Sequence, residues 1–135
     1  MKRVLAAVIS EGCRYLVGQR PSHKRHGSLW EFPGRKIEPG ESDLEAARRE
    51  LREELGVEVK TVLPALFVSQ DGNSDFVIEF VPTVIAGQPQ PIEHDALTWA
   101  TESELTTMDL APSDRRFVEF LRASRNKTDR REATV

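Results

Sequence analysis

Three glutamates have the type and spacing to bind a divalent metal ion. Glu50, Glu53 and Glu54 are three and four residues apart, so a helix would bring their carboxylates to one side. Like charges on adjacent turns repel each other, and a hard cation such as Mg²⁺ or Mn²⁺, which prefers carboxylate oxygens, would remove that repulsion. The alternative is a solvated acidic face, on which arginines such as Arg49 neutralise the glutamates in helical pairs.

The helix that would carry these glutamates is predicted between Ser42 and Leu55. Ser42 is a good N-cap, Glu45 completes a capping box, and Gly56 lies where a left-handed C-cap residue belongs. The apolar stripe of this helix consists of Leu44, Ala47, Leu51 and Leu55. We expect the three glutamates to lie opposite much of this stripe.

The remaining pattern predicts strands around this helix and one helix at the end of the chain. Apolar and β-branched runs predict a strand at Arg3–Ile9 with its hairpin partner at Arg14–Gln19. Further β-rich segments are Val57–Ser69 and Phe76–Ile85, joined by a hairpin turn at Asp71–Ser74, and a short strand at Ala96–Ala100. Thr101 and Glu104 predict a second capping box, and Ser113–Arg122 reads as a terminal helix. Few helices and many strands favour a mixed sheet with helices on its faces.

The segment from Gly34 to Val57 resembles the Nudix box of the Nudix hydrolases, G-x5-E-x7-R-E-U-x-E-E-x-G-U, where U is a bulky aliphatic residue. Eight of its nine defined positions agree: Glu41, Arg49, Glu50, Leu51, Glu53, Glu54, Gly56 and Val57. The lead-in Leu29–Gly34 is similar to that of the MutT-type branch and its CTP pyrophosphohydrolase relatives. The resemblance implies an α/β (α+β) fold, a Nudix-type α/β/α sandwich with a mixed β-sheet between helices.

The same resemblance implies a metal site and a catalytic group. The metal ligands that it implies are the backbone carbonyl of Arg35 and the carboxylates of Glu50, Glu53, Glu54 and Glu93. The ion would be Mg²⁺, with Mn²⁺ possible. The catalytic group that it implies comprises Glu41, Arg49, Glu50 and Glu53. In this group Glu50 is a candidate general base, as is Glu93, and Glu41 would pair with Arg49 to lock the preceding loop onto the helix.

Arg35 is the one departure from the box, which begins with glycine at this position. A carbonyl ligand survives any substitution, whereas a backbone with positive φ would be costly for arginine. Three outcomes stay open: the loop tolerates Arg35 with little change, the metal site is shifted and activity reduced, or Arg35 meets a substrate phosphate.

The resemblance also implies a nucleotide site near Asp114, Arg20 and Phe32. An ionised Asp114 accepts hydrogen bonds and suits a base edge rich in donors, as in cytosine, guanine or 8-oxoguanine. Its alternative role is to cap the terminal helix. Phe32 could stack on a base or lie in the core, and Arg20 could face the base, the phosphates or solvent.

The function implied is Mg²⁺-dependent hydrolysis of a nucleoside triphosphate to monophosphate and pyrophosphate. The substrates would be oxidised or non-standard nucleotides such as 8-oxo-dGTP or modified dCTP or CTP, so the role would be nucleotide sanitisation. One alternative is hydrolysis of another X-linked nucleoside diphosphate. The other is a weakened nucleotide-binding module, because Arg35 replaces the first glycine of the box.

The composition fits one small domain with a small-molecule substrate. The chain has 135 residues and a formal net charge of −3, which argues against a nucleic-acid partner. We expect a single domain over residues 1–123 and a flexible tail over residues 124–135, which are polar and charged. A single cysteine, Cys13, and no membrane-length apolar segment favour a cytoplasmic protein with no membrane partner, as a monomer or homodimer.

Overall fold

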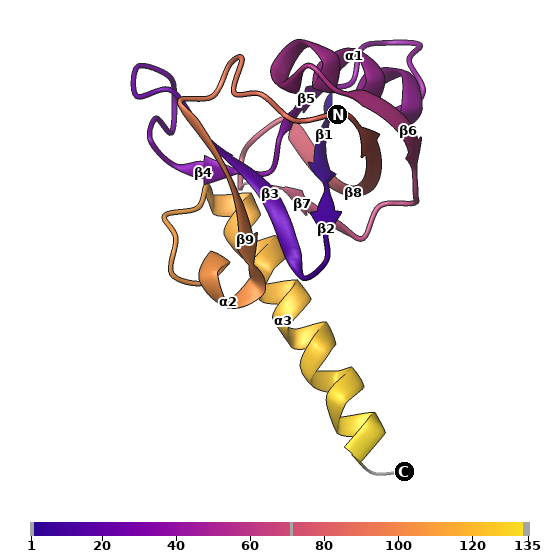
Figure 1. The fold of residues 1–135 in the computed structure, drawn as a ribbon, viewed down its shortest axis with the longest axis vertical. Coiled ribbons are helices and arrows are strands. Elements are labelled where there is room, and N and C mark those ends of the chain that lie inside the picture. The colour runs from indigo at the N-terminus through magenta and orange to yellow at the C-terminus, as the bar shows by residue number, and fades with distance from the viewer. Residues whose placement is uncertain (1, 71, 134–135) are drawn as a thin grey trace.

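The computed structural model describes residues 2–70 and 72–133, with side chains described as far as Arg125. Two β-sheets lie side by side, with α1 on one side and α3 on the other (Figure 1). The strands are β1 Lys2–Val8, β2 Ser10–Glu11, β3 Arg14–Gln19, β4 Trp30–Glu31, β5 Gly34–Lys36, β6 Glu58–Val62, β7 Phe67–Gln70, β8 Phe76–Ala86 and β9 Ala96–Thr101. The helices are α1 Asp43–Leu55, α2 Glu102–Leu105 and α3 Pro112–Ala133.

The larger sheet is mixed, as predicted. Its strands follow the order β5-β1-β8-β6, and β7 also pairs with β8. The central pair β1–β8 is parallel, whereas β5, β6 and β7 pair antiparallel with their neighbours. The smaller sheet is antiparallel and joins β2, β3, β4 and β9.

Alternation along β1 divides the core into two halves. Leu5 and Ala7 face the cluster that contains Leu51 of α1, whereas Ala6 and Val8 face the cluster around α3. Successive side chains of a strand point to opposite faces, so one apolar strand supplies both halves. Burial of a leucine such as Leu51 contributes roughly 1.5–3 kcal/mol, which holds α1 on the sheet. The predicted fold class, a sandwich with a mixed sheet between helices, is confirmed.

Both predicted capping boxes are present. At the start of α1, the Glu45 N–H donates to the Ser42 hydroxyl at 3.1 Å, and the Glu45 carboxylate accepts from the Ser42 N–H at 3.2 Å. Gly56 ends α1 with a φ of 67°, the left-handed conformation expected there. Thr101 and Glu104 form the same reciprocal pair at the start of α2.

Strand pairing differs from the prediction at the first hairpin. The hairpin partner of β3 is the short β2, and β1 lies in the other sheet beside β5 and β8. The chain crosses between the sheets at Ile9, whose carbonyl accepts from the Leu16 N–H at 2.9 Å. Pairing across sheets depends on distant residues, so a local pattern does not reveal it.

Two other strand predictions need correction. The segment Val57–Ser69 forms two strands, β6 and β7, and the short β5 had no predicted counterpart. The β7–β8 pairing agrees with the predicted hairpin, although Asp71 of its turn lies outside the described residues.

Helix α3 is longer than the predicted Ser113–Arg122. It runs over 22 residues to Ala133, so the segment 124–133, expected to be a tail without a folded element, is helical. No glycine or proline follows Pro112, and nothing in the sequence therefore stops the helix. Its last turns project away from the sheets (Figure 1). In the part of the chain that the structure describes, no helix combines the length and apolar character needed to span a membrane.

Candidate active site

A cavity of about 490 Å³ opens between α1, β5, the segment before β9 and the start of α3. Its wall brings together residues that are far apart in the sequence. Of the predicted site residues, the wall includes Arg20, Arg35, Arg49, Glu53, Glu54 and Glu93. The cavity therefore collects most of the predicted metal-binding and phosphate-binding groups in one place.

Glu50 and Glu54 lie on the buried side of α1, which corrects the prediction that they lie opposite the apolar stripe. Their exposed fractions are 0% and 2%, whereas Glu53 is exposed and lines the cavity. At about 100° per residue, Glu50 and Glu54 are roughly 40° apart and sit next to Ala47. The small side chains of Ala46 and Ala47, both fully buried, leave room for the two carboxylates. A solvated acidic face is therefore excluded for Glu50 and Glu54.

The Glu50 carboxylate is fixed by the backbone of β5. Its Oε2 accepts a hydrogen bond from the Arg35 N–H at 2.7 Å, and its Oε1 lies 3.6 Å from Nη2 of Arg49. Oε1 has no hydrogen-bond partner among the described residues. Burial raises the pKa of Glu50 to about 8, although the bond from the Arg35 N–H acts in the opposite direction. This oxygen is thus buried and available to a cation.

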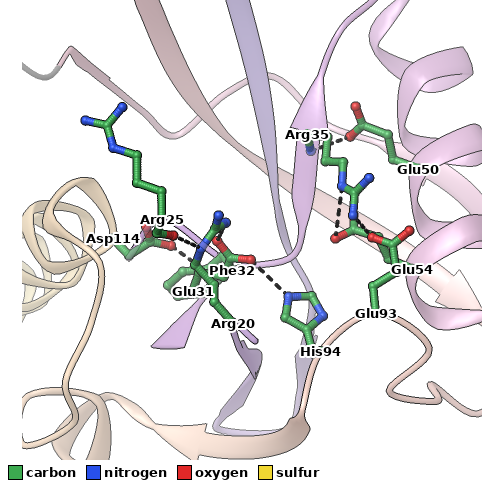
Figure 2. A network of polar contacts seen from close by, with 10 residues as sticks. All are labelled: Arg20, Arg25, Glu31, Phe32, Arg35, Glu50, Glu54, Glu93, His94 and Asp114. Atoms are coloured by element: carbon green, nitrogen blue, oxygen red, sulfur yellow. Dashed lines mark hydrogen bonds and ion pairs between the residues drawn. The ribbon is translucent and has the colours of Figure 1, made fainter. Parts of the chain in front are cut away.

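Glu54 and Glu93 share the guanidinium of Arg35. Glu54 Oε1 lies 3.9 Å from Arg35 Nε, and Glu93 Oε2 forms an ion pair with Arg35 Nη2. Figure 2 shows the Arg35 side chain reaching from β5 to both carboxylates. Burial raises the pKa of Glu54 to about 7, with the charges of His94 and Arg35 lowering it. Oε2 of Glu54 has no hydrogen-bond partner in the described part of the chain.

The donors suit a hard divalent cation, although they are not assembled around one point. Residues 2–70 and 72–125, whose side chains the structure describes, contain no group of three or more His, Cys, Asp or Glu arranged to hold a metal ion. The guanidinium of Arg35 lies between two of the predicted ligands, and the Glu53 side chain is exposed. Buried carboxylate oxygens on Glu50 and Glu54 that lack hydrogen-bond partners are nevertheless the donors that Mg²⁺ prefers.

The predicted pair of Glu41 and Arg49 is present. Nε and Nη2 of Arg49 each donate to a different Glu41 oxygen at 2.8 Å, and Nη2 also donates to the Lys36 carbonyl at 3.2 Å. The Glu38 N–H donates to Glu41 at 2.8 Å. The bond from Arg49 lowers the pKa of Glu41 to about 2, and the same bond raises the pKa of Arg49. Arg49 thereby ties α1 to the loop before it and to β5.

A second polar network, which the sequence did not predict, connects Arg20, Glu31 and His94. Glu31 accepts from Arg20 Nη1 at 2.9 Å, and its other oxygen lies 3.0 Å from His94 Nε2 (Figure 2). The His94 ring packs on Gly18, where an added Cβ would lie 2.6 Å from the ring. Because His94 follows Glu93 directly, this packing fixes the segment that carries Glu93. A glycine inside the apolar strand β3 was the one local signal of this close approach.

Asp114 and Phe32 contact each other outside the cavity wall. The Asp114 carboxylate accepts from the Phe32 N–H at 2.8 Å, and its burial raises its pKa to about 8. The Phe32 ring lies 6.0 Å from the ring of Phe80 and 5.2 Å from that of Phe117, between ring centroids. With 2% exposure, the Phe32 side chain lies in the core, which is one of the two positions that the sequence left open for it. Arg20 does line the cavity.

Comparisons with known proteins place the chain among nucleotide hydrolases. The family model described as NUDIX domain matches residues 1–121. The CTP pyrophosphohydrolase of Escherichia coli (strain K12) is 40% identical over 129 residues, which cover 93% of this chain and 94% of that protein. The 8-oxo-dGTP diphosphatase of Proteus vulgaris is 46% identical over 43 residues, or 32% of this chain and 38% of that protein.

The fold comparison agrees with the sequence comparison. The crystal structure of a MutT NUDIX hydrolase from Burkholderia pseudomallei superposes with a TM-score of 0.77 at 25% sequence identity. The match covers 87% of this chain and 95% of that chain. The arrangement of two sheets and flanking helices is therefore shared over nearly the whole length of both molecules.

Proposed function

The chain belongs to the NUDIX family and is a Nudix hydrolase that acts on nucleotides, and from this premise we propose that it is a Mg²⁺-dependent nucleoside triphosphate pyrophosphohydrolase. It would convert the triphosphate to monophosphate and pyrophosphate. The observation that carries the proposal is the pair of buried carboxylates, Glu50 and Glu54, with oxygens that have no hydrogen-bond partner among the described residues. Burying such groups is costly unless a cation compensates them.

We assign the metal-binding role to Glu50, Glu53 and Glu54, with Glu93 and the Arg35 carbonyl as further ligands. The bound Mg²⁺ would neutralise the polyphosphate and lower the pKa of the attacking water. Glu50 or Glu93 would take the proton from that water. The pair formed by Glu41 and Arg49 would hold the helix and the preceding loop in register for this chemistry.

The cations in the cavity supply the phosphate contacts in this proposal. Arg20, Lys24 and Lys36 line the same cavity as Glu53 and Glu54. Their positive side chains would bind phosphate oxygens on the side away from the metal. A volume of about 490 Å³ suits one small-molecule ligand of nucleotide size.

The proposed substrates are oxidised or non-standard nucleotides, with 8-oxo-dGTP and modified dCTP or CTP as the leading choices. The names of the relatives, a CTP pyrophosphohydrolase and an 8-oxo-dGTP diphosphatase, support this range. Asp114 lies in the first turn of α3, with its carboxylate against the Phe32 N–H just after β4, and remains the candidate for contact with the base. Removal of such nucleotides would be the cellular role.

A nucleotide panel tests the proposal. The protein is incubated with the four dNTPs, CTP, 8-oxo-dGTP and a nucleotide sugar, each with Mg²⁺ or with EDTA, and the products are separated by anion exchange. We expect monophosphate and pyrophosphate from at least one triphosphate, with no product in EDTA. Glu53→Gln should lower kcat by at least about a hundredfold. The matched control is Glu58→Gln, an exposed glutamate on β6, which should retain full activity. Turnover that survives in EDTA, or in Glu53→Gln, would contradict the proposal.

A further inference from the structure

Arg35 occupies its position in the Nudix box without backbone strain. The non-glycine residues with positive φ in the described part of the chain are His26 and Ser28, and Arg35 is not among them. The glycine requirement falls one residue earlier, at Gly34, which has a φ of 149° and whose missing side chain would overlap the Leu5 carbonyl. Position 35 in β5 therefore accepts a long side chain.

The Arg35 side chain turns towards carboxylates that the proposed function assigns to the metal ion. Its guanidinium forms an ion pair with Glu93 and lies 3.9 Å from the Glu54 carboxylate. The Glu54 side chain is only 3% exposed, whereas that of Arg35 is 44% exposed. A partly solvated cation thus reaches a buried anion at the wall of the cavity.

We propose that the Arg35 guanidinium is an internal cation that competes with a divalent metal ion for Glu54 and Glu93. The inference rests on the proposed metal-binding function. Glu54 Oε2 stays open to a metal ion, whereas the guanidinium lies against Glu54 Oε1 and Glu93 Oε2. A metal ion that uses both carboxylates therefore has to displace the guanidinium from between them.

The competition has a defined chemical consequence. The Arg35 N–H that fixes Glu50 belongs to the backbone, so substitution of the side chain leaves that hydrogen bond in place. Loss of the guanidinium frees Glu54 and Glu93 and removes one positive charge next to the ion. We expect the metal affinity to rise by at least about tenfold, the scale for one competing charge beside a divalent cation.

Direct titration with Mn²⁺, without nucleotide, tests the inference. The dissociation constant is measured by isothermal calorimetry and by the electron paramagnetic resonance signal of free Mn²⁺, for the wild type and for Arg35→Gln. The matched control is Lys36→Gln, which removes the neighbouring charge of β5. Lys36 lines the same cavity, and its ammonium lies 4.9 Å from the centroid of the Phe76 ring. The control should change the affinity by less than about threefold.

A second measurement keeps the result independent of catalysis. The rise in melting temperature caused by saturating Mn²⁺ should be larger for Arg35→Gln than for the wild type, since tighter binding stabilises the folded state more. If Arg35→Gln does not fold, Arg35→Lys, which keeps the charge on a shorter side chain, should bind Mn²⁺ with intermediate affinity.

The possible outcomes separate this inference from the proposed function. Equal or weaker affinity in Arg35→Gln, or an equal gain in Lys36→Gln, overturns the competition. Absence of Mn²⁺ binding in every variant overturns it as well, together with the metal role. If no nucleotide of the panel is hydrolysed but Arg35→Gln binds Mn²⁺ more tightly than the wild type, the proposed substrates are contradicted and the competition is supported.

Discussion

Asp114→Asn isolates the effect of one buried carboxyl group on stability. Asp114 is 7% exposed, and its Oδ1 accepts the Phe32 N–H at 2.8 Å. An asparagine carbonyl can accept the same hydrogen bond, so the substitution keeps the acceptor and nearly the same volume. The variant differs from the wild type mainly because its side chain cannot ionise.

The pH dependence follows from the raised pKa of Asp114. Burial moves this pKa from 3.8 to about 8. Between these values the folded state retains a proton that the unfolded state has released, so the free energy of unfolding falls as the pH rises through this window. Below a pH of 3.8 the Asp114 carboxyl group is protonated in both the folded and the unfolded state, and its full contribution to the free energy of unfolding is present. One pKa unit corresponds to about 1.4 kcal/mol, which gives an upper bound of roughly 6 kcal/mol. Relaxation of the site reduces the expected change to about 2–3 kcal/mol.

Urea unfolding at pH 5, 7 and 9, in EDTA and without nucleotide, measures the effect. The free energy of unfolding of Asp114→Asn, relative to the wild type, should increase by about 2–3 kcal/mol from pH 5 to pH 9. The matched control is Asp109→Asn, an exposed aspartate of the same segment, whose difference from the wild type should not change with pH. A flat difference for Asp114→Asn, or one that falls with pH, would refute the reasoning that burial sets this pKa.

Two further substitutions test the contacts that position the site. Arg49→Lys keeps the charge but loses the two parallel hydrogen bonds to Glu41. We expect kcat/KM to fall by about tenfold to a hundredfold while the melting temperature changes little. An unchanged kcat/KM would argue against the positioning role of Arg49. Gly18→Ala places a methyl group 2.6 Å from the His94 ring and should displace the segment that carries Glu93. Chemical denaturation should report a loss of about 1–3 kcal/mol, and a fully stable Gly18→Ala would show that the ring moves freely.

Local sequence signals predicted the elements that depend on neighbouring residues. The limits of α1 followed from Ser42, Glu45 and Gly56, because capping bonds form within one turn of the helix. The contact between Glu41 and Arg49 followed from the Nudix resemblance, and the structure confirms the pairing. The metal-binding role of the glutamates stays a prediction until ions are titrated.

Long-range contacts account for most of what the sequence did not predict. Glu31 and His94 are 63 residues apart, and no periodic pattern links them. The crossing of the chain between sheets at Ile9 depends likewise on pairing with distant strands. The orientation of Glu50 and Glu54 was predicted wrongly because the pattern identifies the apolar stripe, whereas the available space beside Ala46 and Ala47 depends on the sheet below.

The fold accepts arginine at position 35 because the backbone position that requires glycine is the preceding residue, Gly34. The conformational demand lies at Gly34, where any Cβ would overlap the Leu5 carbonyl, and it is met in this chain. At position 35 only the backbone has a fixed task, because the N–H of this residue donates a hydrogen bond to the Glu50 carboxylate. The arginine side chain puts a positive charge beside Glu54 and Glu93, and β5 pairs with β1 in regular antiparallel register at this position. Under the proposed competition, the departure from the motif at Arg35 makes Glu54 and Glu93 less ready to accept a metal ion, while the strand that carries Arg35 keeps its pairing.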